Sequence, residues 1–377
     1  MGNMTEKFSL KDQLFNQQKV GYLASRIKNV YPQFEEQQFN AQILQQFPAL
    51  ELKQRISCIR MQLEKQLPNK FESALTVILN ALPAELDPSK TDDDFGDFIF
   101  APLSDFVAKN GLQKQYLSLS FKALAEITKR FSCEDSIRYF INAYPEESWV
   151  FMQQMSQSDN YHQRRLASEG LRPKLPWCIG INIDYQKPLI LLSQLHNDDT
   201  RYVVRSVANH LNDIAKIDAS LVIQTLKKWQ IENTQSKKEW DFLSKHALRT
   251  LVKKGNKSAL KLLGFNANPK ITVPNFNLKK STLCLGDYLD FSFVIDAQKE
   301  ENLMIDYKII YPTTHQRVSE KVFKIKQLNI KQNTSVPMQK KHLFRLMTTK
   351  KLHAGKYQIH LQINGNIFGK AYFILNV

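Results

Sequence analysis

The sequence predicts a mainly α-helical region followed by an all-β domain, and three observations support this prediction. Up to about residue 265 the apolar residues recur at helical spacing, as in the stretch from Leu10 to Ile27. This helical region also contains a faint internal repeat with a period of about 40 residues. After about residue 270, apolar and polar residues alternate in short stretches, which is typical of β-strands.

The helical region consists of short amphipathic stretches separated by polar or proline-bearing segments, such as residues 83–98 and 142–148. Its repeat is visible when residues 163–171, 203–211 and 243–251 are aligned. The alignment places in register the basic residues Arg165, Arg205 and Lys245 and the leucines Leu171, Leu211 and Leu251. A helix-pair unit of this length is typical of a HEAT-like α-solenoid. We therefore predict a HEAT-like domain over residues 1–265.

The region after residue 270 contains about seven stretches rich in β-branched and aromatic residues. Turn-forming pairs separate them, including Gly286-Asp287 and Asn364-Gly365. About seven short strands in roughly 105 residues are typical of an immunoglobulin-like β-sandwich. We predict this sandwich over residues 270–377, with a linker from Gly264 to Pro269.

The composition is that of a folded protein with an excess of positive charge. Among 377 residues, 52 Lys+Arg against 36 Asp+Glu give a net charge of +16. Such a charge favours a polyanionic partner, either nucleic acid or an acidic membrane surface. The basic residues are densest at 340–356, where the candidate phosphate contacts are Lys340, Lys341, Lys350 and Lys351. A solvated face without a partner explains that cluster equally well.

Cysteine usage and the N-terminus predict a cytoplasmic protein. The four cysteines lie far apart, which favours a reducing compartment over a disulfide framework. The N-terminal residues are polar, and no apolar run has the length that crosses a bilayer. We therefore favour nucleic acid over membrane, and in a bacterium an association with the nucleoid. Gly-rich phosphate loops, nucleophile elbows and His-Glu-x-x-His motifs are absent from the sequence, which argues against nucleotide hydrolysis, esterase and metalloprotease chemistry.

Carboxylates stand among basic residues on three successive predicted helices. On residues 161–171 the spacing predicts a buried side with Leu166 and Ala167, and an exposed stripe of Arg165, Ser168, Glu169 and Arg172. The neighbouring helices carry Arg201, Arg205, Asn209 and Asp213 on one, and Glu134 and Arg138 on the other. Such pairs are often ordinary helix-stabilising contacts. However, an acid on a phosphate-binding face is favoured only where a cation forms, as in N-glycosidic bond cleavage through an oxocarbenium-like sugar.

The blocks that carry these residues resemble the AlkC-type DNA alkylation repair proteins, a family of HEAT-like repeat DNA glycosylases. The likeness covers about residues 8–265 and is most specific in RRLASEGLRPKLPW (164–177), RYVVRSVANHLNDIAK (201–216) and SCEDSIRYFI (132–141). Many members also carry an immunoglobulin-like C-terminal domain. The resemblance implies a monofunctional enzyme that needs neither metal nor cofactor. It would use water to release cationic N3-alkylated bases, 3-methyladenine and 3-methylcytosine, from duplex DNA without flipping them into a deep pocket.

The family's acidic site residues correspond to Glu134, Glu169 and Asp213, which are the predicted catalytic residues. The predicted DNA-binding residues of this region are Arg138, Arg164, Arg165, Arg172, Lys174, Arg201, Arg205 and Trp177. Asp135 and Tyr139 depart from the family pattern, which has an apolar pair after the first glutamate and a proline after the arginine. We expect a monomer that binds alkylated duplex DNA. Two alternatives stay open: a non-catalytic HEAT-repeat protein that binds damaged or branched DNA, and a scaffold that binds only proteins.

Overall fold

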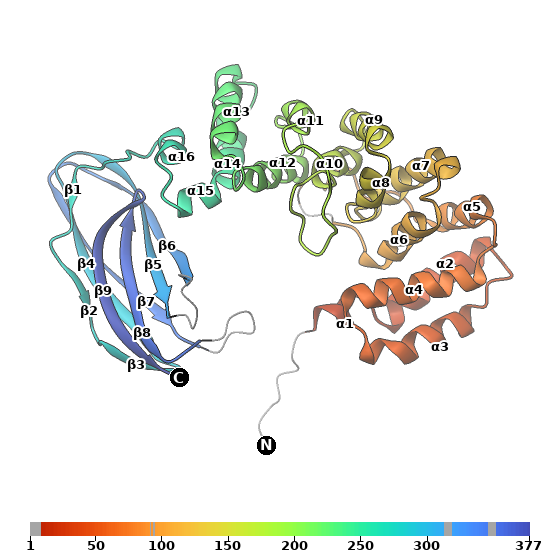
Figure 1. The fold of residues 1–377 in the computed structure, drawn as a ribbon, viewed down its shortest axis with the longest axis horizontal. Helices are drawn as coiled ribbons and strands as arrows, with labels where there is room; N and C mark the ends of the chain where they lie inside the picture. Colours follow the sequence, from red (N-terminus) through yellow and green to blue (C-terminus); the bar gives the residue numbers. More distant parts are fainter. Residues whose placement is uncertain (1–8, 91, 93–94, 313–318, 346–351) are drawn as a thin grey trace. The chain divides into compact units, whose positions relative to one another are not determined.

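A computed structural model of the chain describes residues 9–90, 92, 95–312, 319–345 and 352–377. They form two compact units (Figure 1). The first unit runs to Ile214 and includes Thr234–His246, and the second contains Ala215–Asn233 and Ala247–Val377. The predicted fold class is confirmed, since a helical region is followed by an immunoglobulin-like sandwich.

The first unit consists of short helices whose apolar faces form one core. The periodicity seen in the sequence holds in α2, where Val20, Leu23 and Ile27 are fully or almost fully buried. The helices are α1 (Leu10–Leu14), α2 (Gln17–Val30), α3 (Glu36–Gln46), η1 (Phe47–Ala49), α4 (Leu52–Gln66), α5 (Phe71–Ala81), η2 (Phe98–Phe100), α6 (Ala101–Asn110), η3 (Lys114–Tyr116), α7 (Leu117–Thr128), α8 (Ile137–Ala143), α9 (Pro145–Ser156), α10 (Tyr161–Glu169), α11 (Leu189–Leu195), α12 (Arg201–Ile214) and α14 (Lys237–Ala247).

Helix α10 lies between α9 and α12 and packs against both, and it carries part of the candidate site. It begins after Asn160, whose side chain accepts a hydrogen bond from the His162 amide at 3.0 Å. Gly170 follows its last residue, where a Cβ atom would lie 2.7 Å from Met152 Cε and 2.8 Å from Ile137 Cγ2. A glycine at this position therefore allows α10 to approach its neighbours closely.

The second unit combines three helices with the two sheets of the sandwich. Its elements are α13 (Ala219–Glu232), α15 (Arg249–Lys253), α16 (Lys257–Leu262), β1 (Ile271–Thr272), β2 (Phe276–Leu278), β3 (Thr282–Cys284), β4 (Tyr288–Ala297), β5 (Glu301–Tyr311), β6 (Ser319–Ile330), β7 (Thr334–Leu343), β8 (Gly355–Ile363) and β9 (Asn366–Asn376). One sheet has the order β1-β4-β2, with β7 on the other side of β4, and the second has the order β3-β9-β8-β5-β6. The apolar residues between the two sheets form their own core.

The sandwich differs from the predicted one in its strands, since the described residues form nine strands where the sequence predicts about seven. The short β3 and the long β7 are the main additions. β7 contains Pro337, but it pairs only with β4 in the order above, so a residue without an amide proton is tolerated at this sheet edge. The predicted turn at Asn364-Gly365 is present, with both residues at positive φ (45° and 79°) between β8 and β9. Among the described residues, no helix is long and apolar enough to cross a membrane.

Candidate functional site

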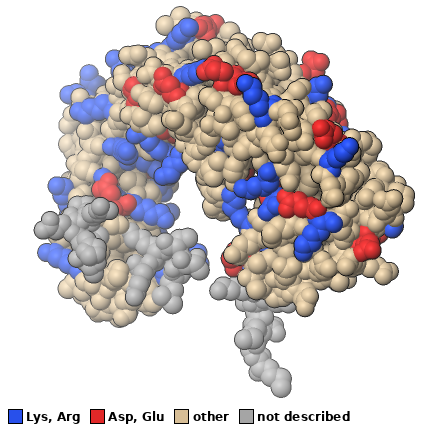
Figure 2. All heavy atoms as spheres, turned by 45° about the vertical axis from the view of Figure 1, so that its right-hand side comes forward, with Lys and Arg blue, Asp and Glu red and all other residues tan. Residues whose placement is uncertain are grey.

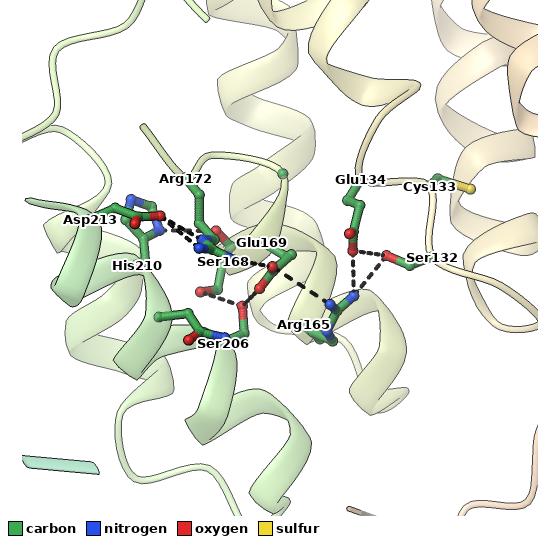
Figure 3. A network of polar contacts seen from close by, with 12 residues as sticks. Ser132, Cys133, Glu134, Arg165, Ser168, Glu169, Arg172, Ser206, His210 and Asp213 are labelled. Carbon is green, nitrogen blue, oxygen red and sulfur yellow. Dashed lines mark hydrogen bonds and ion pairs between the residues drawn. The ribbon is translucent and has the colours of Figure 1, made fainter. Parts of the chain in front are cut away.

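Carboxylate and guanidinium groups alternate along a row built by α10, the loop that follows it, α12 and the turn before α8 (Figure 3). In spatial order the row contains Glu134, Arg165, Glu169, Arg172 and Asp213. We call these five residues the charged row. At formal charge it holds three negative and two positive groups, so it carries one excess negative charge in a protein of net charge +16.

Each guanidinium of the charged row bridges two carboxylates. Arg165 Nη1 lies 2.7 Å from Glu134 Oε2, and its Nη2 lies 3.7 Å from Glu169 Oε1. Arg172 Nη1 lies 2.5 Å from Glu169 Oε1, while its Nε and Nη2 lie 2.9 and 2.8 Å from Asp213 Oδ2. The bridges therefore bring together all three carboxylates predicted to be catalytic.

The structure corrects the predicted exposure of this stripe. Ser168 is fully buried and Glu169 is only 4% exposed, because α12 packs against this side of α10. Arg172 is buried as well. The placement of Glu134 also differs from the prediction of a helical residue, since it lies in a turn and α8 begins only at Ile137. Glu169, Arg172 and Asp213 are thus internal to the helical unit, while Arg165 and Glu134 at the other end of the row are partly exposed.

Glu169 is held in its ionised form. Burial alone would raise the pKa of its carboxyl group, but the charges of Arg165 and Arg172 and hydrogen bonds from Ser206 and Arg172 outweigh burial and hold the pKa below its usual value. For Arg172, burial lowers the pKa, while Glu169 and Asp213 raise it above its usual value. Removing either partner would leave a buried charge without compensation, which is strongly destabilising.

A pair of buried hydroxyl groups lies beside the second oxygen of Glu169, and one of them binds it directly. Ser206 Oγ lies 2.6 Å from Glu169 Oε2 and 2.9 Å from Ser168 Oγ. Because a hydroxyl carries one proton, Ser206 can donate to the carboxylate while Ser168 donates to Ser206. With Oε1 bound by Arg172 and Oε2 bound by Ser206, the carboxylate is fixed in one orientation.

His210 lies on α12 beside the charged row and adds no charge to it. Burial lowers the pKa of its imidazole to about 4, so the ring is neutral at pH 7. Its Nδ1 lies 2.9 Å from the Ser168 carbonyl oxygen, which assigns the proton to Nδ1. The Nε2 atom makes no hydrogen bond to any described residue. The excess negative charge of the row therefore persists at neutral pH.

The prediction that Arg138 contacts DNA is corrected by its burial, because its side chain is 0% exposed. Its Nε donates to the Ile179 carbonyl at 2.6 Å, and its Nη1 donates to the carbonyls of Gly170 and Arg172 at 3.0 and 2.9 Å. A guanidinium in this position cannot reach a phosphate. It instead clamps the loop that follows α10 and that carries Arg172 and Trp177.

Three other arginines predicted to bind DNA already have carboxylate partners. Arg164 pairs with Asp198, Arg201 with Glu239, and Arg205 with Asp92. Together with the two arginines of the charged row, every arginine predicted to contact phosphate between residues 164 and 205 forms an ion pair. Phosphate binding by these groups stays a prediction, and it requires an exchange of partners.

The loop after α10 carries the candidates that do face solvent, Lys174 and Trp177. Trp177 is 71% exposed and has a φ of 65°, a left-handed conformation that is unusual for a large side chain. Its carbonyl accepts a hydrogen bond from Lys53 Nζ at 2.6 Å. Such strain in an exposed residue is frequent at ligand-binding positions.

The predicted basic residues of the sandwich lie apart from the charged row in the sequence. Lys and Arg side chains lie at several separate places on the part of the sandwich visible in Figure 2, with fewer acidic ones among them. On β7, Lys340 is half-buried, and Lys341 is exposed at 3.8 Å from Asp290. Lys350 and Lys351 lie outside the described residues.

Several polar residues around the row are not found by sequence reasoning. Ser132 Oγ lies 2.7 Å from Glu134 Oε2 and 2.8 Å from Arg165 Nη1. Ser206 stands seven residues before Asp213, so the two share one face of α12. That helical spacing is the signal from which Ser206 could have been found.

We expect Ser206→Ala to raise the pKa of Glu169 and to lower the free energy of unfolding by about 1.5–3 kcal/mol at pH 7, the range for a hydrogen bond to a charged group. A carboxyl with a depressed folded-state pKa stabilises the fold above its unfolded-state pKa, and this contribution is lost as the pH falls through the folded-state pKa. The variant should therefore lose part of this contribution. Carboxyl-carbon NMR titration measures the pKa, and urea unfolding at several pH values measures the free energy.

Ser104→Ala is the matched control, because Ser104 and Ser136 form a buried hydroxyl pair at 2.9 Å that has no carboxylate within it. An unchanged Glu169 titration in Ser206→Ala would contradict the role given to Ser206.

Comparisons with known proteins agree with this architecture. Residues 272–377 match a family model described as the C-terminal Ig-like domain of the uncharacterised protein YhaZ. The uncharacterized protein YhaZ of Bacillus subtilis (strain 168) is 30% identical over 359 residues, which cover 94% of this chain and 96% of that protein. Among solved structures, the chain is similar to Pseudomonas fluorescens alkylpurine DNA glycosylase AlkC bound to DNA containing an abasic site analog. That match has a TM-score of 0.87 at 29% identity and covers 98% of this chain and 100% of that one.

Proposed function

The chain belongs to the family of AlkC-type DNA alkylation repair proteins to which YhaZ also belongs, and we propose that it is a DNA glycosylase that removes alkylated bases from duplex DNA. The observation that carries this proposal is the charged row, which holds an excess negative charge within a basic protein. A surface that only holds phosphates gains nothing from three carboxylates. A site where positive charge develops during a reaction is stabilised by them.

The proposed substrates are cationic N3-alkylated bases, 3-methyladenine and 3-methylcytosine. When the N-glycosidic bond breaks, its electron pair passes to the base, which leaves as a neutral molecule. The positive charge then resides on the sugar, and the carboxylates lower the energy of this oxocarbenium-like transition state. Water adds to C1′ and transfers its proton to a carboxylate, which leaves an abasic site in an intact strand.

Glu169 and Asp213 are the proposed catalytic carboxylates, with Glu134 as the third. Arg172 holds the first two together, and Arg165 joins Glu134 to them. Each ionised carboxylate has about four lone-pair sites, so Glu169 retains acceptor capacity for a water molecule beside its bonds to Arg172 and Ser206.

The proposal is tested by incubating the protein with methylated duplex DNA and measuring released bases by chromatography. Release of 3-methyladenine, with abasic sites and no strand cleavage, is the expected result. The rival function is a non-catalytic protein that binds damaged or branched DNA through the same residues. DNA binding without base release at high protein concentration would favour that rival. We further propose that the protein acts as a monomer in the cytoplasm.

We expect Trp177→Ala to weaken binding to methylated duplex by roughly 5- to 150-fold, the range for loss of one stacked base. The exposed indole sits on a loop that Arg138 and Lys53 hold in place, so it can stack with little loss of conformational freedom. Fluorescence anisotropy of a labelled duplex measures the affinity. Ile231→Ala is the control, because Ile231 is also exposed and apolar but lies on α13. Equal affinities of Trp177→Ala and wild type would remove Trp177 from the interface.

A further inference from the structure

The ion pairs of the helical unit raise the question of which cations bind the DNA backbone. Five arginines of this unit are each paired with a carboxylate, and a sixth, Arg138, is bound to backbone carbonyls. The five paired arginines are Arg164, Arg165, Arg172, Arg201 and Arg205. A paired guanidinium must give up its partner before it can neutralise a phosphate. Cations without such partners are therefore better suited to bind the backbone of any duplex.

The sequence contains a long stretch without acidic residues that is rich in basic ones, although Lys245 near its start pairs with Asp241 just outside it. Between Asp241 and Asp287 there is no Asp or Glu. The same stretch contains nine basic residues, Lys245, Arg249, Lys253, Lys254, Lys257, Lys261, Lys270, Lys279 and Lys280. Two short helices, α15 and α16, lie within it and belong to the same compact unit as the sandwich.

Four lysines on these two helices and in the turn between them form one group, which we call the lysine hairpin: Lys253, Lys254, Lys257 and Lys261. All four are exposed, and none forms an ion pair with a carboxylate of the described residues. Lys257 and Lys261 stand four residues apart on α16, so they project from the same side of that helix. Like charges placed this close repel each other, and bound anions relieve that repulsion.

The lysine hairpin is fixed to the sandwich rather than loosely attached. Gly255 has a φ of 74°, and a Cβ atom there would lie 2.8 Å from the Gly365 carbonyl oxygen in the β8–β9 turn. Gln362 Nε2 donates to the Lys253 carbonyl at 3.3 Å, and Asn364 Nδ2 donates to the Asn266 carbonyl at 2.9 Å. The lysines therefore project from a backbone that is already ordered, which lowers the entropic cost of binding.

One buried acid lies within electrostatic range of this group. Burial raises the pKa of Asp306 on β5 to about 6, and the charges of Lys324 and Lys253 oppose that rise. Asp306 itself is only 6% exposed, whereas the lysines of the hairpin are exposed to solvent. The surface that the hairpin offers to a partner remains positively charged.

We propose that the lysine hairpin binds the phosphate backbone of duplex DNA independently of sequence and damage. This inference rests on the proposed function, and it assigns the non-specific part of DNA binding to the second unit. The charged row would then read the lesion, while the hairpin supplies affinity for any duplex. Each phosphate that a lysine neutralises releases condensed counterions, so binding by the hairpin must depend steeply on salt.

The test replaces all four lysines with glutamine in the full-length protein and measures affinity for undamaged duplex at several salt concentrations. The slope of log Kd against log salt is expected to fall by about 0.9 for each lost phosphate contact, hence by roughly 2–4 overall. The control replaces four exposed lysines of the helical unit, Lys65, Lys70, Lys114 and Lys122, and so changes the net charge equally. Its slope should stay close to that of the wild type.

The outcomes separate the possible failures. Equal loss of slope in both variants would mean that net charge alone attracts DNA, and an unchanged slope in the hairpin variant would remove the hairpin from the interface. Either result overturns the inference while leaving base release by the wild type, and hence the proposed function, intact.

Wild-type binding without base release would instead overturn the proposed function alone. A hairpin-dependent affinity for phosphatidylglycerol vesicles without one for DNA would reassign the surface to membranes. Thermal unfolding of both variants verifies that each is folded.

Discussion

Glu169→Gln is expected to slow base release from methylated duplex by about 10²–10⁴-fold, the range for a lost acid–base or electrostatic group, and to change DNA affinity by less than about threefold. The amide keeps the shape of the side chain, and its carbonyl oxygen can accept from Arg172 while its NH2 group donates to Ser206 Oγ, which then accepts instead of donating. It removes the excess negative charge of the row, which is what the proposed mechanism requires. Single-turnover release kinetics measure the rate, and anisotropy measures the affinity.

Glu239→Gln is the matched control, because Glu239 is also paired with an arginine of the helical unit but lies outside the charged row. The control should release base at close to the wild-type rate. An equal loss of rate and affinity in Glu169→Gln would assign Glu169 a structural role instead of a chemical one.

Arg172→Lys is expected to have the second largest effect. A lysine keeps the charge but has a single ammonium group, which cannot bridge Glu169 and Asp213 in the way the guanidinium does. The two buried carboxylates would then lie close together with incomplete compensation. We expect the free energy of unfolding to fall by about 2–4 kcal/mol, by analogy with broken buried ion pairs, and base release to slow at least tenfold.

Urea unfolding and single-turnover kinetics of Arg172→Lys at pH 7 test both effects. Arg201→Lys is the control, since Arg201 also bonds a carboxylate through two nitrogens but is more exposed to solvent. Wild-type stability in Arg172→Lys would show that the bridge between the carboxylates contributes nothing to the fold.

Much of the architecture can be predicted from local patterns. Helical spacing identifies the core side of α10, and the Asn364-Gly365 pair identifies the β8–β9 turn. β7 is missed because Pro337 and its lysines are unusual in a strand, and only its position at a sheet edge makes them compatible with one. Patterns within a short stretch of sequence do not show whether a strand lies at the edge or in the middle of its sheet.

The site is predictable in its residues but not in its contacts. The carboxylates are found because they stand at helical spacing in blocks that resemble a known family. The burial of the stripe is missed because a charged face normally points to solvent, and only α12 makes this one internal. Arg138 is missed for a related reason, since its partners are backbone carbonyls of a loop 32 to 41 residues away. Neither the packing of α12 against the stripe nor the carbonyl partners of Arg138 can be seen in the local sequence.

The alternating charges also determine how the helical unit can open. Arg165 on α10 is bonded to Glu134 in the turn before α8, and Arg172 in the loop after α10 is bonded to Asp213 on α12. Local unfolding of any one of these elements would therefore leave a charge on its neighbour without its partner. The amide protons of α8, α10 and α12 should therefore exchange with solvent as one cooperative unit, with a common opening free energy, whereas the terminal helix α1 exchanges independently. Proteins with repeated helix pairs generally open one repeat at a time. Here the residues proposed to cleave the glycosidic bond would join consecutive repeats into a single unit of stability.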